Sequence, residues 1–294
     1  SSMMRTTLTG LSLDELRAFV TSLGEKPYRA AQLFSWLYAR GAASFEDMSD
    51  LSGPFRELLA QVAAPGSLQL VTARTSSQDG TTKFLLRLAD GRAIESVLIQ
   101  PEPSSPDVDR RLTLCMSTQV GCPLDCAFCA TGTMGFTRNL TAGEIVEQFL
   151  HAQRQTSRRI SNLVYMGMGE PMLNYENVMR SVDLLTDDRG PNIGARHITI
   201  STAGYADQIR RMADEHRRVK LALSLHALDE SKRTALIPIT RKHGIAALTD
   251  ALDYYYRRTR MRPTLEYIPF AGFNDTNADA DLLIRFSRRV PCKV

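Results

Sequence analysis

The feature that most constrains this fold is a regular alternation of short apolar segments and amphipathic segments from residue 111 onward. Five apolar stretches have the length of buried strands, and they span residues 112–117, 162–168, 197–202, 220–226 and 264–270. Amphipathic stretches with helical spacing lie between them, at residues 141–156, 174–186, 204–216 and 243–258. Because buried strands that alternate with helices form parallel βαβ units, the sequence predicts an α/β fold, either an open sheet or a barrel.

The first hundred residues follow a different pattern. Residues 12–62 contain three short segments with helix caps and helical spacing, which predict a small helical module. Residues 68–100 alternate between apolar and polar side chains, and they contain two Asp-Gly pairs that are typical of hairpin turns. We therefore predict an N-terminal helical accessory domain at 1–65, a β-meander leading into the core at 66–100, and the α/β domain at 101–294.

Composition is typical of a globular protein and leaves the partner open. Of the 294 residues, 43% are hydrophobic and 23% are charged. No apolar run could cross a bilayer, no signal-peptide pattern is present, and five cysteines do not make a secreted disulfide framework. We therefore expect a cytoplasmic monomer with no membrane partner. The net charge of +4 comes entirely from residues 100–294. A basic half fits a nucleic-acid partner, and it equally fits a solvated arginine-rich surface.

Three cysteines, Cys122, Cys126 and Cys129, lie close together in a C-x3-C-x2-C pattern. Thiolates bind soft or borderline metals and iron–sulfur clusters, whereas a structural zinc site usually has four ligands in two close pairs. Three thiolates on one loop suit a [4Fe–4S] cluster with one iron open to a non-protein ligand. Zinc with a distant histidine, and ordinary buried cysteines, are the alternatives.

Polar or glycine-rich residues end the predicted strands, at positions 115–117, 167–170, 201–202 and 224–226. Ligand sites in parallel α/β folds lie at the carboxyl ends of the strands. We therefore expect these residues to lie together around one ligand site at the carboxyl ends of the strands.

These motifs carry a resemblance to a known superfamily. CPLDCAFC at 122–129 resembles the cysteine signature of the radical S-adenosylmethionine superfamily, and GMGEP at 167–171 resembles its glycine-rich strand end. Longer stretches, LCMSTQVGC, MGMGEPMLNYENV, HITISTAG and LALSLHA, resemble the RlmN/Cfr family of RNA adenine methyltransferases. The N-terminal YRAAQLFSWLY is similar to the accessory domain of that family, so the resemblance covers nearly the whole chain. The QVGC and GEP forms are closer to the RlmN branch than to the Cfr branch.

The resemblance implies a partial (β/α)6 radical SAM barrel that holds a [4Fe–4S] cluster and S-adenosyl-L-methionine. Cys122, Cys126 and Cys129 would ligate the cluster, whose electron cleaves the sulfonium to give a 5′-deoxyadenosyl radical. The residues implied to bind S-adenosylmethionine are Gly169, Glu170, Ser201, Ser224, Leu225 and His226. For the serines and the histidine, capping of strand ends is the alternative.

The resemblance also implies two catalytic residues. Cys115 matches the family cysteine that takes a proton from the methylated adenine carbon and then forms a transient disulfide to release the RNA. A thiolate can perform both tasks. Glu95 matches an acid regarded as a proton acceptor. From the residues alone, Cys115 also fits a small buried side chain, and Glu95 also fits an outward-facing strand carboxylate.

The function implied is methylation of adenosine C2 in 23S ribosomal RNA and in tRNA, through a methylated cysteine and with an electron donor such as a flavodoxin-type reductant. A Cfr-like C8 methyltransferase and a non-catalytic metal-bearing RNA-binding module are the alternatives. The sequence ends at VPCKV, and Cys292 matches an ordinary family position, not the methyl-carrying cysteine. We therefore expect a sequence truncated at its C-terminus, which binds the cluster but does not complete methyl transfer.

Overall fold

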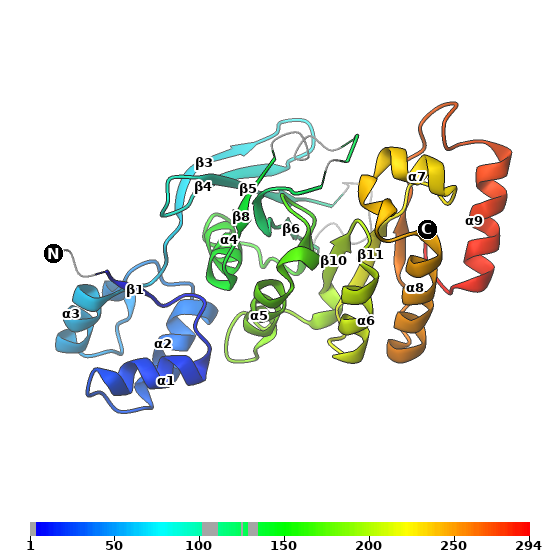
Figure 1. Cartoon of the computed structure of the whole chain (residues 1–294). Helices are drawn as coiled ribbons and strands as arrows, with labels where there is room; N and C mark the ends of the chain where they lie inside the picture. Colours follow the sequence, from blue (N-terminus) through cyan, green and yellow to red (C-terminus); the bar gives the residue numbers. More distant parts are fainter. Residues whose placement is uncertain (1–3, 102–110, 125, 129–134) are drawn as a thin grey trace. The chain divides into compact units, whose positions relative to one another are not determined.

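The computed structural model describes residues 4–101, 111–124, 126–128 and 135–294 (Figure 1). The chain forms two compact units, each assembled from segments that are distant in sequence. Unit 1 contains Ser1–Ser117, Leu140–Leu163 and Glu176–Gly194. Unit 2 contains Thr118–Asn139, Val164–Tyr175 and Ala195–Val294.

The N-terminal part of unit 1 is helical, as the capping pattern predicts. Helix α1 (Leu13–Ser22) begins at a capping box in which Ser12 and Glu15 exchange hydrogen bonds, and Gly24 follows its end with a φ of +81°. The remaining elements here are α2 (Arg29–Phe34), a π-helical turn (Ser35–Ala39), a short 3₁₀ turn (Phe45–Asp47) and α3 (Gly53–Val62). Strand β1 (Thr6–Thr7) pairs in parallel with β2 (Ala63–Ala64). This pairing joins the two ends of the helical segment.

An antiparallel sheet forms the second part of unit 1. Its strands, in spatial order, are β6 (Thr113–Cys115), β5 (Ala93–Ile99), β4 (Thr82–Arg87) and β3 (Gln69–Thr75). Gly80 and Gly91, from the two Asp-Gly pairs, have φ values of +74° and +89° in the connections. The predicted meander is therefore confirmed.

Helix α4 (Ala142–Arg154) is the most deeply packed helix of unit 1. Every residue from 142 to 150 is buried, including the polar side chains of Glu147 and Gln148. The Glu147 carboxylate accepts hydrogen bonds from the backbone N of Ser67 at 2.8 Å and of Leu68 at 2.9 Å. Gln148 accepts from the backbone N of Ser117 and donates to its carbonyl, both at 2.8 Å. These bonds satisfy the buried polar groups of α4.

Unit 2 contains the parallel strands β10 (Ile198–Thr202), β11 (Lys220–Ser224) and β12 (Thr264–Glu266), and a two-stranded antiparallel pair, β7 (Gln119–Gly121) and β8 (Phe136–Asn139). Its helices are α6 (Ala206–Asp214), α7 (Glu230–Leu236), α8 (Ile245–Thr259) and α9 (Asn277–Arg289). Strand β9 (Asn162–Tyr165) and helix α5 (Tyr175–Thr186) each cross the boundary between the units. The alternation of parallel strands and helices confirms the predicted α/β fold.

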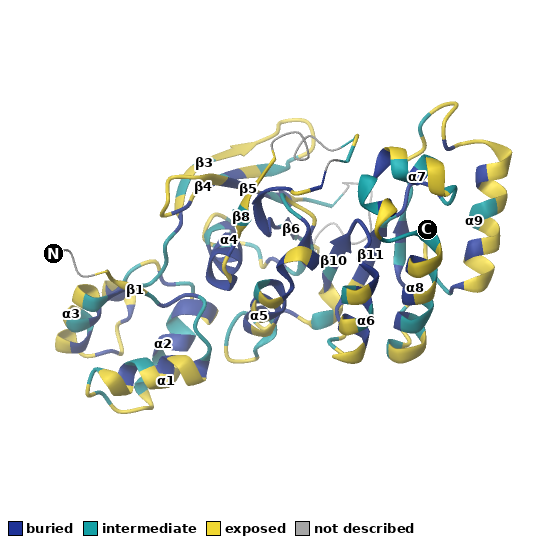
Figure 2. Cartoon of the chain, viewed as in Figure 1, coloured by how far each residue is buried: buried dark blue, intermediate teal, exposed yellow. Residues whose placement is uncertain are grey.

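The strands of unit 2 are more deeply buried than its helices. In Figure 2, β10 and β11 are mostly dark blue, whereas α6 and α8 are dark on one side and yellow on the other. On α8, Tyr255 is buried and Arg257 and Arg258 are exposed, as an amphipathic helix requires. Among the residues that the structure describes, no helix is long and apolar enough to cross a membrane.

Candidate active site

The cysteine loop of unit 2 follows β7 and is attached to its surroundings by backbone hydrogen bonds. Cys122 is buried, and its N–H donates to the carbonyl of Gly135 at 3.1 Å. Cys126 is half-buried, and the N–H of the next residue, Ala127, donates to the carbonyl of Leu236 at 3.0 Å. Cys129, the third predicted cluster ligand, lies outside the described residues. The structure therefore places two of the three predicted thiols on one loop.

The aromatic side chain within the cysteine motif joins this loop to the end of β11. The Phe128 ring packs edge-on against His226, with ring centroids 4.7 Å apart and an interplanar angle of 77°. It also lies 6.2 Å from the Phe270 ring, measured between centroids. Phe128 thus brings the cysteine loop against the predicted S-adenosylmethionine residues.

Glu170 lies in the segment that follows β9, and its side chain is only 2% exposed. One carboxylate oxygen accepts from the backbone N of Ala203 at 2.7 Å and from Thr202 Oγ1 at 3.1 Å, and the other accepts from the backbone N of Met172 at 2.9 Å. Burial raises the pKa of Glu170 to about 7, although these hydrogen bonds oppose the shift. A cation placed beside the carboxylate would favour its charged form. Glu170 is therefore a candidate partner for a cationic group.

The glycine before this glutamate allows close approach of two backbones. Gly169 has a φ of +98°, and a Cβ there would lie 2.6 Å from the Cβ and 2.7 Å from the backbone N of Gln119. The Gln119 side chain accepts from the backbone N of Glu170 at 2.8 Å and donates to Asn139 at 2.7 Å. Because Gln119 begins the strand that leads to Cys122, the GMGEP segment packs against the base of the cysteine loop.

The carboxyl end of β11 contributes the three consecutive residues predicted to bind S-adenosylmethionine. The backbone N–H groups of Leu225 and His226 donate to the carbonyl of Glu266, at 3.0 and 3.2 Å. His226 has a φ of +56°, and its Nδ1 accepts from the backbone N of Ile268 at 2.9 Å. Burial and the nearby Arg233 lower the pKa of His226 to about 4, so its ring is neutral at neutral pH with the proton on Nε2.

The serines of the predicted site occupy neighbouring strand ends. Ser201 is buried on β10, where it pairs in register with Ala222 of β11. Ser224 is half-buried at the end of β11, and its hydroxyl donates to the Glu266 carboxylate at 3.3 Å. Unit 2 therefore collects every predicted S-adenosylmethionine residue at the carboxyl ends of its strands.

The two predicted catalytic residues, Glu95 and Cys115, belong to unit 1. Cys115 of β6 lies opposite Val97 of β5, and Glu95 is two residues from Val97 on the same strand. Because side chains alternate along a strand, Glu95 and Cys115 share one face of this sheet. Glu95 is exposed and forms an ion pair with Lys83 at 3.7 Å, while burial raises the pKa of the Cys115 thiol.

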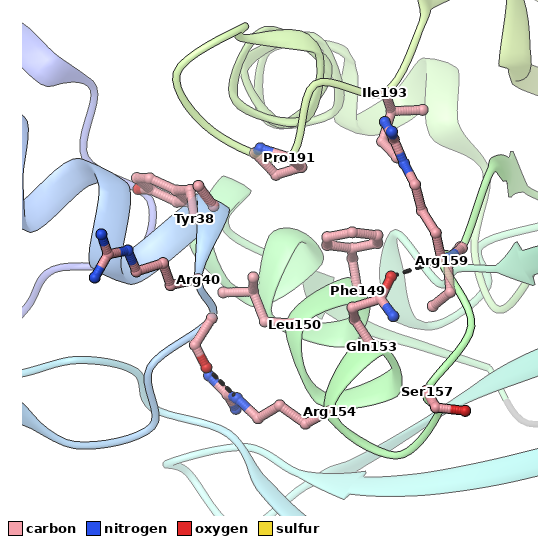
Figure 3. Close-up of a pocket in the computed structure, with 13 residues that line it drawn as sticks. Tyr38, Arg40, Phe149, Leu150, Gln153, Arg154, Ser157, Arg159, Pro191 and Ile193 are labelled. Carbon is pink, nitrogen blue, oxygen red and sulfur yellow. Dashed lines mark hydrogen bonds between the residues drawn. The ribbon is translucent and has the colours of Figure 1, made fainter. Parts of the chain in front are cut away.

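Unit 1 also contains a cavity of about 370 Å³ (Figure 3). Buried aromatic and aliphatic side chains, among them Tyr38, Phe149 and Leu150, form its floor. Three arginines, Arg40, Arg154 and Arg159, line it as well, and among the described residues that line it none carries a carboxylate. Arg154 donates to the carbonyl of Gly41 at 2.6 Å, and Arg159 donates to that of Asn192 at 2.9 Å. The cavity is therefore cationic around an apolar floor.

Two side chains at the site were missed by the sequence analysis. Gln119 stands in QVGC, three residues before Cys122, and its position directly before the cysteine motif was a usable signal. Arg233 is completely buried in α7. No pattern marks it, because an arginine in a short polar helix is normally expected to face solvent.

Comparisons with known proteins identify the family of the chain. The family model described as "Ribosomal RNA large subunit methyltransferase N-terminal domain" matches residues 6–64, and the radical SAM superfamily model matches residues 116–283. The chain is 48% identical to a probable dual-specificity RNA methyltransferase RlmN of Thermotoga sp. (strain RQ2), over 94% of this chain and 78% of the relative. A protein of the same name from Flavobacterium psychrophilum is 40% identical, over 98% of this chain and 82% of the relative.

A solved structure supports the same assignment. A radical SAM methyltransferase from Sphaerobacter thermophilus aligns with a TM-score of 0.91 and 42% identity, over 98% of this chain and 83% of that chain. The expected radical SAM fold, the expected enzyme class and the family resemblance are thereby confirmed. The chain belongs to the RlmN family of radical SAM methyltransferases.

Proposed function

We propose that this protein uses a [4Fe–4S] cluster and S-adenosylmethionine to methylate C2 of an adenosine in RNA, with 23S ribosomal RNA and tRNA as substrates. The observation that carries the proposal is the meeting of the cysteine loop, the buried Glu170 and the end of β11 within unit 2. The curated relatives are named as dual-specificity RNA methyltransferases, which supports an RNA substrate. We further propose that the protein acts as a cytoplasmic monomer and receives electrons from a flavodoxin-type reductant.

The residues of unit 2 divide the binding task. Cys122, Cys126 and Cys129 would hold the cluster, since thiolates are its usual protein ligands. Glu170 would accept the ammonium of the methionine moiety, with Gly169, Ser201 and residues 224–226 around the same ligand. When bound, the cluster supplies the single electron that cleaves S-adenosylmethionine to methionine and a carbon radical.

The electrostatics around Glu170 favour a ligand with a cationic group. An ammonium near Glu170 favours its carboxylate form, so binding lowers the raised pKa of this residue and makes it fully anionic at neutral pH. His226 stays neutral, because its Nδ1 accepts a backbone hydrogen bond and burial disfavours the imidazolium. It can therefore donate through Nε2 without adding positive charge beside the ligand.

Cys115 and Glu95 would handle the proton that leaves the adenine ring. The raised pKa keeps the Cys115 thiol protonated at neutral pH. Another group must therefore remove the thiol proton before the Cys115 sulfur can accept a proton itself. Glu95 shares its face of the sheet and forms an exposed ion pair with Lys83. We assign Glu95 as the proton acceptor. Cys115 would resolve the protein–RNA adduct: its sulfur would bond to the sulfur of the methyl-carrying cysteine, the bond from that sulfur to the methylene carbon would break, and the carbon would take the electron pair and the thiol proton to become the methyl group.

The cationic cavity of unit 1 is the proposed RNA contact. Phosphate groups of RNA are bound by arginines. Arg154 and Arg159 line this cavity beside Tyr38 and Phe149, and Arg40 lies at its rim with its guanidinium over the Trp36 ring, 4.1 Å from the ring centroid (Figure 3). Removing Arg40 and Arg159 together should lower the slope of log affinity against log salt by about 1.4 to 1.8, since each lost phosphate contact contributes roughly 0.7 to 0.9. Arg17, which pairs with Asp14, is the matched control, and R17A should leave the slope unchanged.

Mass spectrometry of nucleosides tests the proposed reaction. RNA is incubated anaerobically with dithionite, S-adenosylmethionine labelled in its methyl group, and a version of the protein that extends to the full length of its relatives. The proposal predicts labelled 2-methyladenosine and the release of 5′-deoxyadenosine, and C126A should abolish both. Labelled 8-methyladenosine would identify a Cfr-like enzyme instead. RNA binding without any 5′-deoxyadenosine would identify a non-catalytic binding module.

A further inference from the structure

Arg233 is the largest completely buried side chain of the described residues, and it lies on α7 beside the proposed active site. Burying a guanidinium group is costly unless it gains hydrogen bonds and a compensating charge. The contacts of Arg233 show which of these it has.

Its hydrogen bonds connect the ends of two strands. The guanidinium donates to the carbonyls of Leu225 at 3.1 Å and Ser224 at 2.9 Å, both at the end of β11. It donates to the carbonyl of Ala203, directly after β10, and to Thr240 Oγ1 at 2.8 Å. All four acceptors are neutral, so they satisfy the donors without compensating the charge.

The helix that carries Arg233 also holds the cysteine loop. The carbonyl of Leu236, one helical turn after Arg233, accepts the 3.0 Å hydrogen bond from Ala127, next to Cys126. Burial lowers the pKa of Arg233 to about 10, and the Cys126 charge opposes this shift. Ala203, whose carbonyl accepts from Arg233, also donates its N–H to the Glu170 carboxylate at 2.7 Å, so the guanidinium lies one residue away from that buried acid.

Acidic groups of the proposed site also act on Tyr205. Burial raises the pKa of the Tyr205 hydroxyl, and the charges of Glu170, Cys122 and Cys126 raise it further. The proposed site therefore combines two cysteine side chains and the Glu170 carboxyl group, and Arg233 provides a buried positive charge beside them.

We propose that Arg233 is a positioning residue that holds the cysteine loop against the strand ends and, through its charge, raises the reduction potential of the cluster bound there. Reduction adds one electron, and hence one negative charge, to a cluster already surrounded by thiolates. A fixed buried cation stabilises the reduced form more than the oxidised form, because net charge and solvent exposure set the potential of such clusters. This inference rests on the proposed function, since it requires a cluster on the cysteine loop.

Three substitutions separate charge from hydrogen bonding. R233K keeps the charge and loses most of the four hydrogen bonds, whereas R233Q keeps part of the hydrogen bonding and loses the charge. T240V removes one neutral acceptor and leaves Arg233 in place. The midpoint potential of the dithionite-reducible cluster is measured by a redox titration followed by electron paramagnetic resonance, and thermal unfolding is measured on the same proteins.

We expect the midpoint potential to become more negative in R233Q and to stay near that of the wild type in R233K and T240V, while all three variants unfold at lower temperature. A purely structural role would lower the unfolding temperatures and leave the potential of R233Q unchanged, which would overturn the inference. If R233Q does not fold, T240D places a carboxylate beside the retained Arg233 and should shift the potential in the same negative direction. An unchanged potential in a cluster-loaded T240D protein contradicts the inference, whereas absence of any cluster in the wild type contradicts the proposed function.

Discussion

The Glu170→Gln substitution should have opposite effects on stability and on ligand binding. The folded pKa of Glu170 is raised from 4.5 to about 7, because the carboxylate is buried. A raised folded pKa means that the folded protein binds this proton more tightly than the unfolded chain does. The contribution of Glu170 to stability is therefore fully present below pH 4.5 and is lost as the pH rises to about 7.

The size of this effect follows from the shift. A difference of about 2.5 pKa units between folded and unfolded states corresponds to about 3 kcal/mol above pH 7. Glutamine carries no charge, so it removes this cost of ionising a buried carboxylate. Its amide NH₂, however, faces one of the groups that now donate to the carboxylate, and this donor–donor contact costs about 1 kcal/mol. E170Q should therefore be within about 1 kcal/mol of the wild type at pH 5 and about 2 kcal/mol more stable at pH 8.

Two measurements check this reasoning. Urea unfolding of the cluster-free protein at pH 5 and pH 8 gives the difference in free energy of unfolding, and equilibrium binding of S-adenosylmethionine to the cluster-loaded protein gives its affinity. Loss of a charge-assisted hydrogen bond of about 1.5 to 3 kcal/mol should weaken binding by roughly 10-fold to 150-fold. A stability difference that does not change with pH would refute the assigned ionisation. An unchanged affinity would refute the assigned contact with the ligand.

Three further substitutions or reactions test other parts of the molecule. G169A should lower the free energy of unfolding by at least about 2 kcal/mol, since the new Cβ meets the backbone of Gln119. The control G91A has open space around its new Cβ and should lower the free energy of unfolding by only about 1 kcal/mol, because of its positive φ. Equal losses in urea titrations would contradict the close approach of Gly169 to Gln119. Cys115 should react with iodoacetamide more slowly at pH 8 in the folded protein than in the urea-unfolded protein, because its pKa is raised, and equal rates by mass spectrometry would argue against burial. E147A leaves three hydrogen-bond donors without their acceptor and should lower the free energy of unfolding by about 3 kcal/mol. E147Q, which keeps one acceptor oxygen, should lose less stability. A wild-type unfolding curve for E147A would count against these hydrogen bonds.

The strands and longer helices were predictable because their signals are local. Ser12 with Glu15, and Thr141 with Glu144, form capping boxes at the starts of α1 and α4. The strand ends of the site were predictable for a similar reason, since polar residues at 201–202 and 224–226 interrupt apolar runs. In each case the residues that form the element also carry its signal.

Other features depend on contacts between distant segments and leave little trace in the sequence. The short pair β7 and β8 is formed by residues on either side of the cysteine loop, and each strand is too brief to show a period. Helix α4 has the pattern of a half-buried helix, yet it is buried from residue 142 to 150, because Gln148 and Glu147 bond to other segments of unit 1. The burial of Arg233 follows from the strand ends that surround it, not from its neighbours in sequence.

The most direct test of the central claim is pulsed electron paramagnetic resonance of the anaerobically reconstituted, dithionite-reduced protein. S-adenosylmethionine labelled with ¹⁵N in its amino group is added, and hyperfine coupling to the label is recorded. The account predicts a reduced [4Fe–4S] signal whose spectrum changes on addition and which couples to the label, because in the proposed function the iron without a cysteine ligand would bind the methionine moiety. A protein that retains zinc without iron, or a cluster whose spectrum shows no coupling to the label, would contradict it.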